Sequence, residues 1–314
     1  MSTRDANMIF ETTLNTMTIF FLILATGFAA GKLGVVKKDY LPHFAQLITK
    51  ILLPVLMFYS SYESITRQTL VENLSMLGLS VAFYALVIAV TWLLSKALRL
   101  PHDKDRIFMF CFVFGNTGFV GLPLLLALFP ETGVLYMMLF TVVDQLLFWT
   151  FGIWLATARD RKRASFNARN LLTPNIVALV LALVFVVFEL PLPSVVCDAL
   201  ATVKNATSAM CMMYLGALLC FSNWMGVLRR KELYVGVGVK MIALPMACGS
   251  ALMLTGLPYE MVASLTMIMA LPTMTVVPMI ASQYGREGEY AAGITAVTLA
   301  LSVATLPLVA FVAL

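Results

Sequence analysis

The sequence predicts an all-α integral membrane protein of ten transmembrane helices, arranged as two inverted repeats of five helices. Three observations support this fold class. Of the 314 residues, 61% are hydrophobic and only 12% are charged, about half the charged fraction of an ordinary soluble domain. The apolar residues form runs near the ~20 residues that a helix needs to cross a bilayer. The basic residues collect in alternate loops, as they do on the cytoplasmic side of membrane proteins.

Apolar runs between proline, glycine and charged residues give the ten expected spans in chain order. They lie at 14–34, 43–62, 74–98, 107–129, 133–157, 172–190, 195–221, 233–255, 259–283 and 290–313. Spans at this spacing occupy the chain with short connections. We therefore expect one integral membrane domain over residues 1–314, with no separate soluble domain.

The loop charges orient these spans. Sixteen of the 21 Lys and Arg residues fall in alternate loops, against two, Arg4 and Arg67, on the opposite side. The positive-inside rule then predicts that both termini lie on the extracytoplasmic side of the cell (inner or plasma) membrane. The basic residues Lys32, Lys37 and Lys38 follow the first apolar run. Because a signal peptide has its charge before the run, we expect an uncleaved first helix.

Five spans in each half, 1–160 and 165–314, require the second half to be inverted in the membrane. Weak internal similarity supports a repeat. Leu-Pro opens both the second and the seventh span, and AQLITK (Ala45–Lys50) resembles ALATVK (Ala199–Lys204). Inverted repeats with broken helices are typical of secondary transporters. Coincidence among apolar helices is the alternative explanation.

The fourth and ninth expected spans each carry an interruption near the middle. The fourth contains Gly115, Asn116, Thr117, Gly118, Gly121 and Pro123, and in the ninth Pro272 and Pro278 bracket Thr273 to Val277. Glycine weakens a helix by ~1 kcal/mol relative to alanine, and proline removes a backbone donor. We expect unwound backbone at mid-depth, which is tolerated only where protein or a wet cavity surrounds it. Simple proline kinks are the alternative.

These two spans run in opposite directions, so their interrupted segments could cross at the midplane. Each half-helix that follows a break begins with free N–H groups and a partial positive charge. Pro123 suits the first turn of such a half-helix. Two helix N-termini meeting in a dry site favour an anionic group.

Five ionisable residues fall within or near the ends of expected spans: Lys50, Asp144, Asp198, Lys204 and Lys240. Such residues are rare in a bilayer and are functional candidates. Asp144 could bind a coupling proton, or it could form a structural ion pair with a lysine. Lys50 and Lys204 could add positive potential around an anion, extend to the surface or pair with Asp144. We expect Lys240 to extend to the cytoplasmic surface and Asp198 to be hydrated.

Other classes of site are disfavoured. The five cysteines lie in apolar stretches without metal-ligand spacing, and the two histidines, His43 and His102, lie near basic loop residues, so we expect no metal and no cofactor. No aromatic and basic stretch suits nucleic acid. We expect no enzyme, since HExxH, GxSxG and a second central Asp beside Asp144 are missing. GFAAG (Gly27–Gly31) matches GxxxG, which marks either a dimer face or internal packing.

Three stretches resemble the auxin efflux carrier family in its bacterial, malonate-transporter-like branch. They are GNTGFVGLPLLLALF (Gly115–Phe129), NLLTPNIVALVLALVF with the LPLP that follows it (Asn170–Pro193), and ALPTMTVVPMIASQYGREGEYAAGITAVTLALSVATLPL (Ala270–Leu308). The last stretch combines a proline-containing crossover, a Tyr-Gly turn and a tenth helix with a Leu-Pro ending. The resemblance extends over essentially the whole chain.

The resemblance implies a fold like that of bile-acid symporters and auxin carriers. Spans 1, 2, 6 and 7 would form a scaffold, and spans 3–5 and 8–10 a transport domain that moves like an elevator. It implies transport of organic anions such as auxin, malonate or malate, and a possible homodimer. By motif position, Asn116 and Thr117, and Pro272 with Thr273, would line the site. Unlike sodium-coupled bile-acid carriers, the ninth span has no Gln or Glu near its break. This departure favours proton coupling or uniport.

The sequence thus leads us to expect a secondary transporter of a small mono- or dicarboxylate. The anion would bind backbone N–H groups near Gly118, the Asn116 side chain and the hydroxyls of Thr117, Thr273 and Thr275, with Lys50 or Lys204 adding charge and Asp144 coupling a proton. Two alternatives stay open: a membrane sensor that binds an organic acid without moving it, and a sodium-coupled organic anion symporter.

Overall fold

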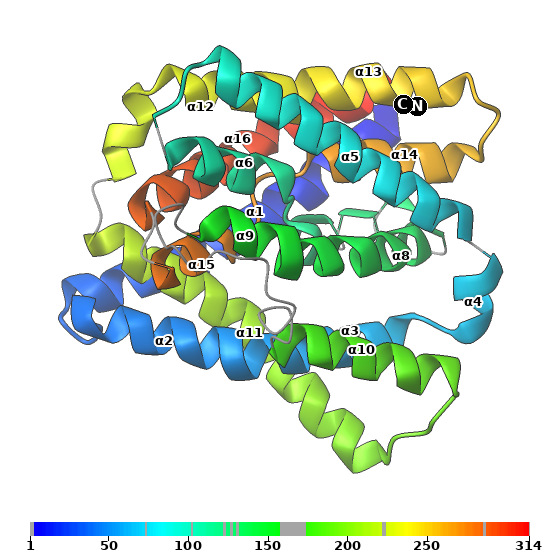
Figure 1. The fold of residues 1–314 in the computed structure, drawn as a ribbon, viewed down its shortest axis with the longest axis horizontal. Coiled ribbons are helices and arrows are strands. Elements are labelled where there is room, and N and C mark those ends of the chain that lie inside the picture. Colours follow the sequence, from blue (N-terminus) through cyan, green and yellow to red (C-terminus); the bar gives the residue numbers. More distant parts are fainter. Residues whose placement is uncertain are drawn as a thin grey trace.

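The computed structural model is helical throughout the part of the chain that it describes (Figure 1). It describes residues 3–72, 74–101, 103–121, 124–125, 128–129, 132–157, 174–221, 224–284 and 287–313. Within these ranges the only extended pairing is an isolated antiparallel bridge between Gly115 and Thr273. The predicted all-α class is confirmed for these residues. Pro123, His102 and the predicted boundary between the halves lie outside them.

Five of the expected spans are uninterrupted α-helices. They are α1 (Thr3–Lys32), α5 (Leu74–Ala97), α10 (Pro174–Val187), α11 (Ser194–Phe221) and α16 (Gly288–Ala313). A short helix, α4 (Arg67–Glu72), precedes α5. Asp198 is exposed near the start of α11, as expected.

Three other spans contain a π-helical turn, in which the backbone holds one extra residue. The pairs are α2 (Leu41–Leu47) with α3 (Leu53–Ser64), α8 (Thr132–Leu147) with α9 (Ile153–Ala156), and α12 (Lys231–Gly236) with α13 (Leu244–Met253). The N–H of Leu53 bonds the carbonyl of Ile48, five residues back. Pro54 follows directly. The wide turn accommodates a proline that has no N–H to donate and whose ring crowds the preceding turn.

Within the described residues, five helices are long and apolar enough to cross a bilayer. They are Lys38–Glu63, Ser75–Ala97, Leu135–Ala156, Lys231–Met253 and Gly288–Phe311. Shorter apolar helices cover Thr18–Lys32, Val177–Val187 and Tyr259–Ala270. The count of ten spans remains a prediction.

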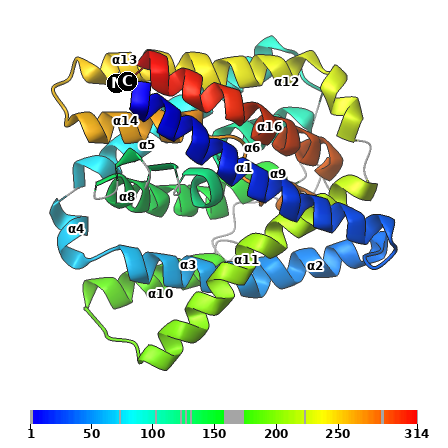
Figure 2. The same cartoon turned by 180° about the vertical axis from the view of Figure 1, so that it is seen from behind.

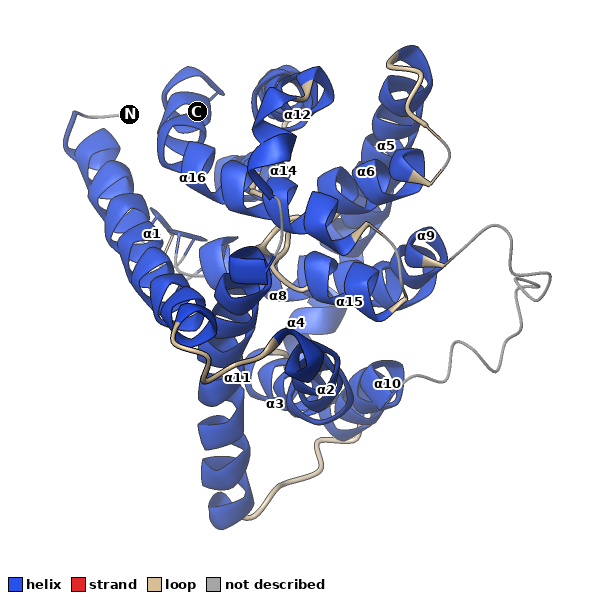
Figure 3. Ribbon diagram, turned by 90° about the vertical axis from the view of Figure 1, so that its left-hand side faces the viewer, coloured by secondary structure: helices blue, strands red, loops and turns tan. Residues whose placement is uncertain are grey.

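The helices form two groups (Figure 1). One contains α2, α3, α10 and α11, and the other contains α5, α6, α8, α9 and α12 to α16. Helix α1 crosses the back of the molecule and packs against both α11 and α16 (Figure 2). In Figure 3, which is turned by 90°, α2, α3, α10 and α11 lie in the lower part and the helices of the other group lie above them. The start of α1 and the end of α16 lie at the same end of the molecule.

Glycines allow α1 and α11 to approach closely. A Cβ atom at Gly27 would collide with the backbone of Met213, and one at Gly216 would collide with the carbonyl oxygen of Leu24. At Gly31 a Cβ would lie 2.9 Å from the sulfur of Cys220. The GxxxG motif of α1 therefore serves packing within the chain.

The two interrupted spans are the most enclosed. Helix α6 (Lys104–Val113) is buried at every position from Ile107 to its end, and α14 (Tyr259–Ala270) from Met261 to its end. A helix that is apolar all round belongs in the interior. Aromatic rings pack against α6, in which Phe110 lies 5.4 Å from Phe148 between ring centroids. Protein therefore surrounds the backbone where these helices break, as irregular backbone in a membrane requires.

Candidate functional site

The two helix interruptions meet. Helix α6 ends at Val113, and a π-helical turn begins at Thr117; α14 ends at Ala270, and α15 (Val277–Gln283) follows. Between them, the N–H of Asn116 donates to the carbonyl of Pro272 at 2.8 Å, and the N–H of Met274 donates to that of Phe114 at 3.0 Å. These two bonds satisfy polar groups that the breaks release from the helical ladders.

Thr273 connects the broken segment of the ninth span to α6 and to α16 by hydrogen bonds. Its hydroxyl donates to the carbonyl oxygen of Cys111 at 2.8 Å, and its N–H donates to the hydroxyl of Thr298 on α16 at 3.2 Å. The segment fits closely at Gly115, where a Cβ atom would lie 3.1 Å from the Cβ of Leu271. The junction of the two breaks is thus bonded and tightly packed.

Lys240 supports the junction from the π-helical turn Val237–Ala243. It is 2% exposed, and its ammonium donates to the carbonyl oxygen of Leu271, just past the end of α14. The expectation that Lys240 extends to the cytoplasmic surface was wrong. The break of α14 provides an acceptor for the ammonium inside the protein, which sequence position alone does not reveal.

Asp144 supports the junction from α8 and is fully buried. Its carboxylate accepts hydrogen bonds from the Tyr84 hydroxyl and, at 3.0 Å, from the Gln145 amide. The Thr117 hydroxyl also donates to this carboxylate, at 3.5 Å, and its acceptor is Oδ2, the oxygen that accepts from Gln145. The charges of Asp144 and Lys240 also interact. The described residues form no ion pair between Asp144 and a lysine, so both alternatives for Asp144, a coupling proton and a structural ion pair, stay predictions.

A cavity of about 480 Å³ adjoins the junction. It lies between α3 and α11 on one side and α8 with the two breaks on the other. Its walls are mostly apolar with a few polar groups, the usual make-up of a small-molecule site. The polar lining residues are Ser60, Ser61, Glu63, Asn116, Thr117, Thr141, Gln145, Trp149, Lys204 and Asn205.

The predicted site residues fall into four groups. Asn116, Thr117, Gly118 and Lys204 line the cavity. Pro272, Thr273 and Thr275 belong to the broken segment but are not lining residues, and Thr273 and Thr275 are buried. Lys50, in the turn between α2 and α3, is exposed and does not line the cavity. Asp144 does not line the cavity, but it accepts hydrogen bonds from Thr117 and Gln145, which do.

Glu63 and Trp149 are two of the polar cavity residues that were not anticipated from the sequence. Glu63 forms an ion pair with Lys204, and the exposed fractions of the two side chains are 49% and 26%. Trp149 is 3% exposed, and its indole N–H has no hydrogen-bond partner among the described residues. Trp149 was missed because it lies in an apolar stretch that gives no sign of a polar role. Glu63 was missed because it lies just past the end of the predicted second span. Lys204 also lies over the ring of Tyr59, 5.3 Å from its centroid.

Comparison with known proteins identifies the family. A family model described as membrane transport protein, that of the auxin efflux carriers, matches residues 12–167 and again residues 161–310. The chain belongs to this family. The two matches together cover nearly the whole chain.

A curated relative agrees with this family. The chain is 23% identical over 211 residues to an uncharacterized transporter of Methanocaldococcus jannaschii, covering 65% of this chain and 68% of the relative. Family membership and the apolar helices make the protein a multi-pass membrane protein of a transporter family. Membership in a transporter family also accords with the expectation that the chain is no enzyme.

Proposed function

We propose that the protein is a secondary transporter of small organic anions, mono- or dicarboxylates, which bind in the cavity beside the two breaks. The observation that carries the proposal is Trp149, a lining residue of the cavity whose buried indole N–H has no hydrogen-bond partner among the described residues. A buried donor without a partner is costly, and the indole N–H can only donate. It therefore suits a ligand that brings acceptor atoms, such as a carboxylate.

Charge supports the same class of ligand. Lys204 is the cationic side chain of the cavity, and Glu63 holds it in an ion pair. A carboxylate that enters can exchange places with Glu63, since the pair is partly exposed and such pairs contribute little to stability. The Asn116 side chain and the Thr117 hydroxyl complete a polar patch on the opposite wall.

The position of the cavity supports alternating access. It lies between α3 and α11, which pack against each other, and the group that contains both breaks. We assign α1, α2, α3, α10 and α11 to a scaffold and the remaining long helices to a transport domain, which would slide past the scaffold like an elevator. Ten spans in two inverted halves, in the cell membrane with both termini outside, complete the proposal. A homodimer stays a prediction.

Asp144 offers a route to proton coupling. Protonation of its carboxyl would change the hydrogen bonds that Thr117 and Gln145 make on the cavity side. Substrate binding and proton binding would then influence each other through two direct contacts. The proposal therefore favours proton-coupled transport over sodium coupling.

The experiment is uptake and binding of a panel of radiolabelled carboxylic acids by the purified protein, in vesicles and in detergent. Trp149→Phe keeps an aromatic ring but removes the N–H, so affinity for the transported acid should fall by about tenfold or more, since one hydrogen bond to a charged group contributes about 1.5–3 kcal/mol. Asn116→Ala should also weaken binding. Full uptake and binding by both variants would refute the site. Binding without flux in the wild type would instead indicate a membrane receptor.

A further inference from the structure

A second cavity of about 330 Å³ lies on the outside of the molecule, between α5, the start of α6 and the region around α9. It shares no lining residue with the cavity of the proposed transport site. Two of its lining residues, Trp92 and Trp154, are 50% and 40% exposed, so the cavity opens at the surface as a groove. The transport proposal makes no use of this groove.

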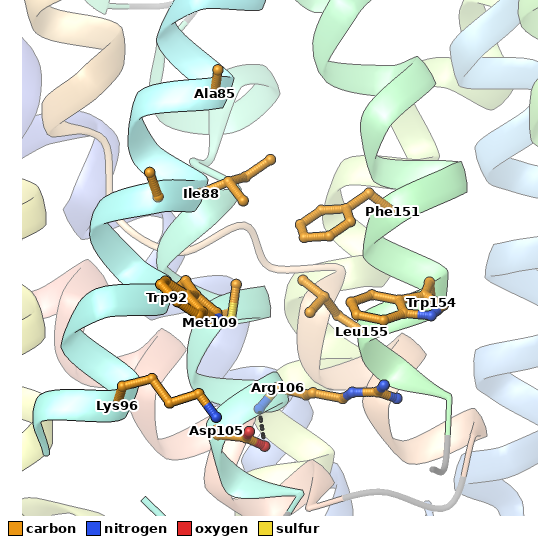
Figure 4. A pocket seen from close by; sticks show the side chains of 11 residues that line it. Ala85, Ile88, Trp92, Lys96, Asp105, Arg106, Met109, Phe151, Trp154 and Leu155 are labelled. Carbon is orange, nitrogen blue, oxygen red and sulfur yellow. Dashed lines mark hydrogen bonds between the residues drawn. The ribbon is translucent and has the colours of Figure 1, made fainter. Parts of the chain in front are cut away.

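The groove has a polar end and an apolar end (Figure 4). Lys96, Asp105 and Arg106 lie together at one end, and Ala85, Ile88 and Phe151 lie at the other. The tryptophan rings lie between the two ends. A phospholipid that stands upright in a leaflet has the same order, from headgroup to acyl chain.

The polar end carries positive charge. Arg106 stacks on Trp154 at 4.2 Å from the ring centroid, and its guanidinium donates to the carbonyl oxygen of Thr157 at 3.1 Å. The carboxylate of Asp105 accepts the backbone N–H of Arg106 at 2.7 Å. Lys96 is exposed on α5. The polar end therefore contains two cationic side chains, Lys96 and Arg106, and one carboxylate, Asp105, which leaves a net positive charge.

The sequence places this polar end at the cytoplasmic surface. Lys96, Arg99, Lys104 and Arg106 form one of the basic loops that the positive-inside rule assigns to that side. Tryptophan is enriched where the hydrocarbon core meets the headgroups, which is the level of Trp92 and Trp154 in the groove. Basic pockets between membrane helices on the cytoplasmic side are suited to anionic lipid headgroups.

We propose that the groove binds an anionic phospholipid of the cytoplasmic leaflet. Its phosphate lies between Lys96 and Arg106, and an acyl chain follows the apolar wall past Ile88 and Phe151. Charge complementarity selects an anionic headgroup over a zwitterionic one. The apolar wall selects a lipid over a free phosphate ion.

The test uses quenching of tryptophan fluorescence by lipids with brominated acyl chains. The full-length protein is placed in phosphatidylcholine vesicles, and either brominated phosphatidylglycerol or brominated phosphatidylcholine is added. Phosphatidylglycerol should half-quench the accessible signal at a mole fraction about fivefold lower, the effect expected for a basic residue near an anionic lipid. Trp92→Phe should remove part of this difference, since Trp92 lines the groove.

Two lysine variants separate the groove from general surface charge. Lys96→Gln should largely abolish the preference, whereas Lys231→Gln removes an exposed charge from another basic loop and should retain it. Both variants should unfold at the temperature of the wild type. The proposal is overturned if the two lipids quench equally, if Lys96→Gln keeps the preference, or if excess inorganic phosphate abolishes it, which would indicate an ion site.

Discussion

The backbone N–H of Asn116 donates to the carbonyl oxygen of Pro272 at 2.8 Å, and this bond joins two interrupted helices from opposite halves of the chain. A second bond, from Met274 to Phe114, runs the other way at 3.0 Å. Lys240 also bonds the Leu271 carbonyl, and Asp144 accepts a hydrogen bond from Thr117, so two further hydrogen bonds hold the junction. The two breaks should therefore move as one unit, together with whatever the cavity beside them binds.

Gly115→Ala tests the close packing of this junction. The new methyl group would lie 3.1 Å from the Cβ of Leu271, in a region where both partners are backbone-bonded. Overpacking of this kind costs about 1–3 kcal/mol, so the thermal unfolding midpoint in detergent should fall. Gly78→Ala on α5 is the matched control, because a Cβ there meets nothing within 4 Å. An unchanged midpoint for Gly115→Ala would show that the junction is looser than the structure indicates.

Lys240→Met tests the buried cation. The variant leaves the Leu271 carbonyl without its donor and Asp144 without an opposite charge. Loss of a hydrogen bond from a charged donor costs about 1.5–3 kcal/mol. Unfolding by denaturant in micelles should reveal this loss, and Lys50→Met, which removes an exposed lysine from a similar turn, should cost far less.

The double variant of Lys240→Met with Asp144→Asn measures the interaction between the two charges. The second change removes the uncompensated carboxylate, so the double variant should be more stable than the sum of the single losses predicts. Strict additivity would mean that the two charges do not interact across the junction.

The apolar runs predicted the all-α class and the bounds of several helices, because a helix that crosses a bilayer must be apolar over about 20 residues. Helix α5, for example, begins at Leu74 and ends at Ala97, against the predicted 74–98. Glycine and proline also located both interruptions. The π-helical turns were not predicted, because Pro54 and Pro245 fit equally well with a simple kink.

The site was harder to predict, since its polar groups come from helices that the sequence does not place side by side. Asn116 and Thr117 were found because the break itself marks them. Trp149 lies in an ordinary apolar run, and only the tertiary structure reveals that it lines the cavity and that its buried indole N–H has no partner among the described residues. Lys240 shows the opposite case, in which a lysine near a span end has its partner inside the protein.

Asp144→Asn tests proton coupling. If protonation of Asp144 drives transport, wild-type uptake should rise when the uptake side is acidified, and the variant should lose this pH dependence. The amide retains hydrogen-bonding capacity toward Tyr84 and Gln145, so substrate binding should persist. Uptake at a series of pH values measures the effect. Asp198→Asn, the same change at an exposed site, should keep the wild-type profile, and the proton role fails if Asp144→Asn keeps it too.

Lys204→Gln and Glu63→Gln should change the affinity for the anion in opposite directions. Loss of the lysine removes the cation of the cavity, whereas loss of the glutamate frees that cation from its partner. Because both side chains are partly exposed, we expect changes of only about fivefold, equivalent to about 1 kcal/mol. Competition binding with a series of acids measures both, with Lys37→Gln as a control for net charge. If Glu63→Gln weakened binding as much as Lys204→Gln, the intact ion pair itself, and not the free ammonium, would be what the substrate requires.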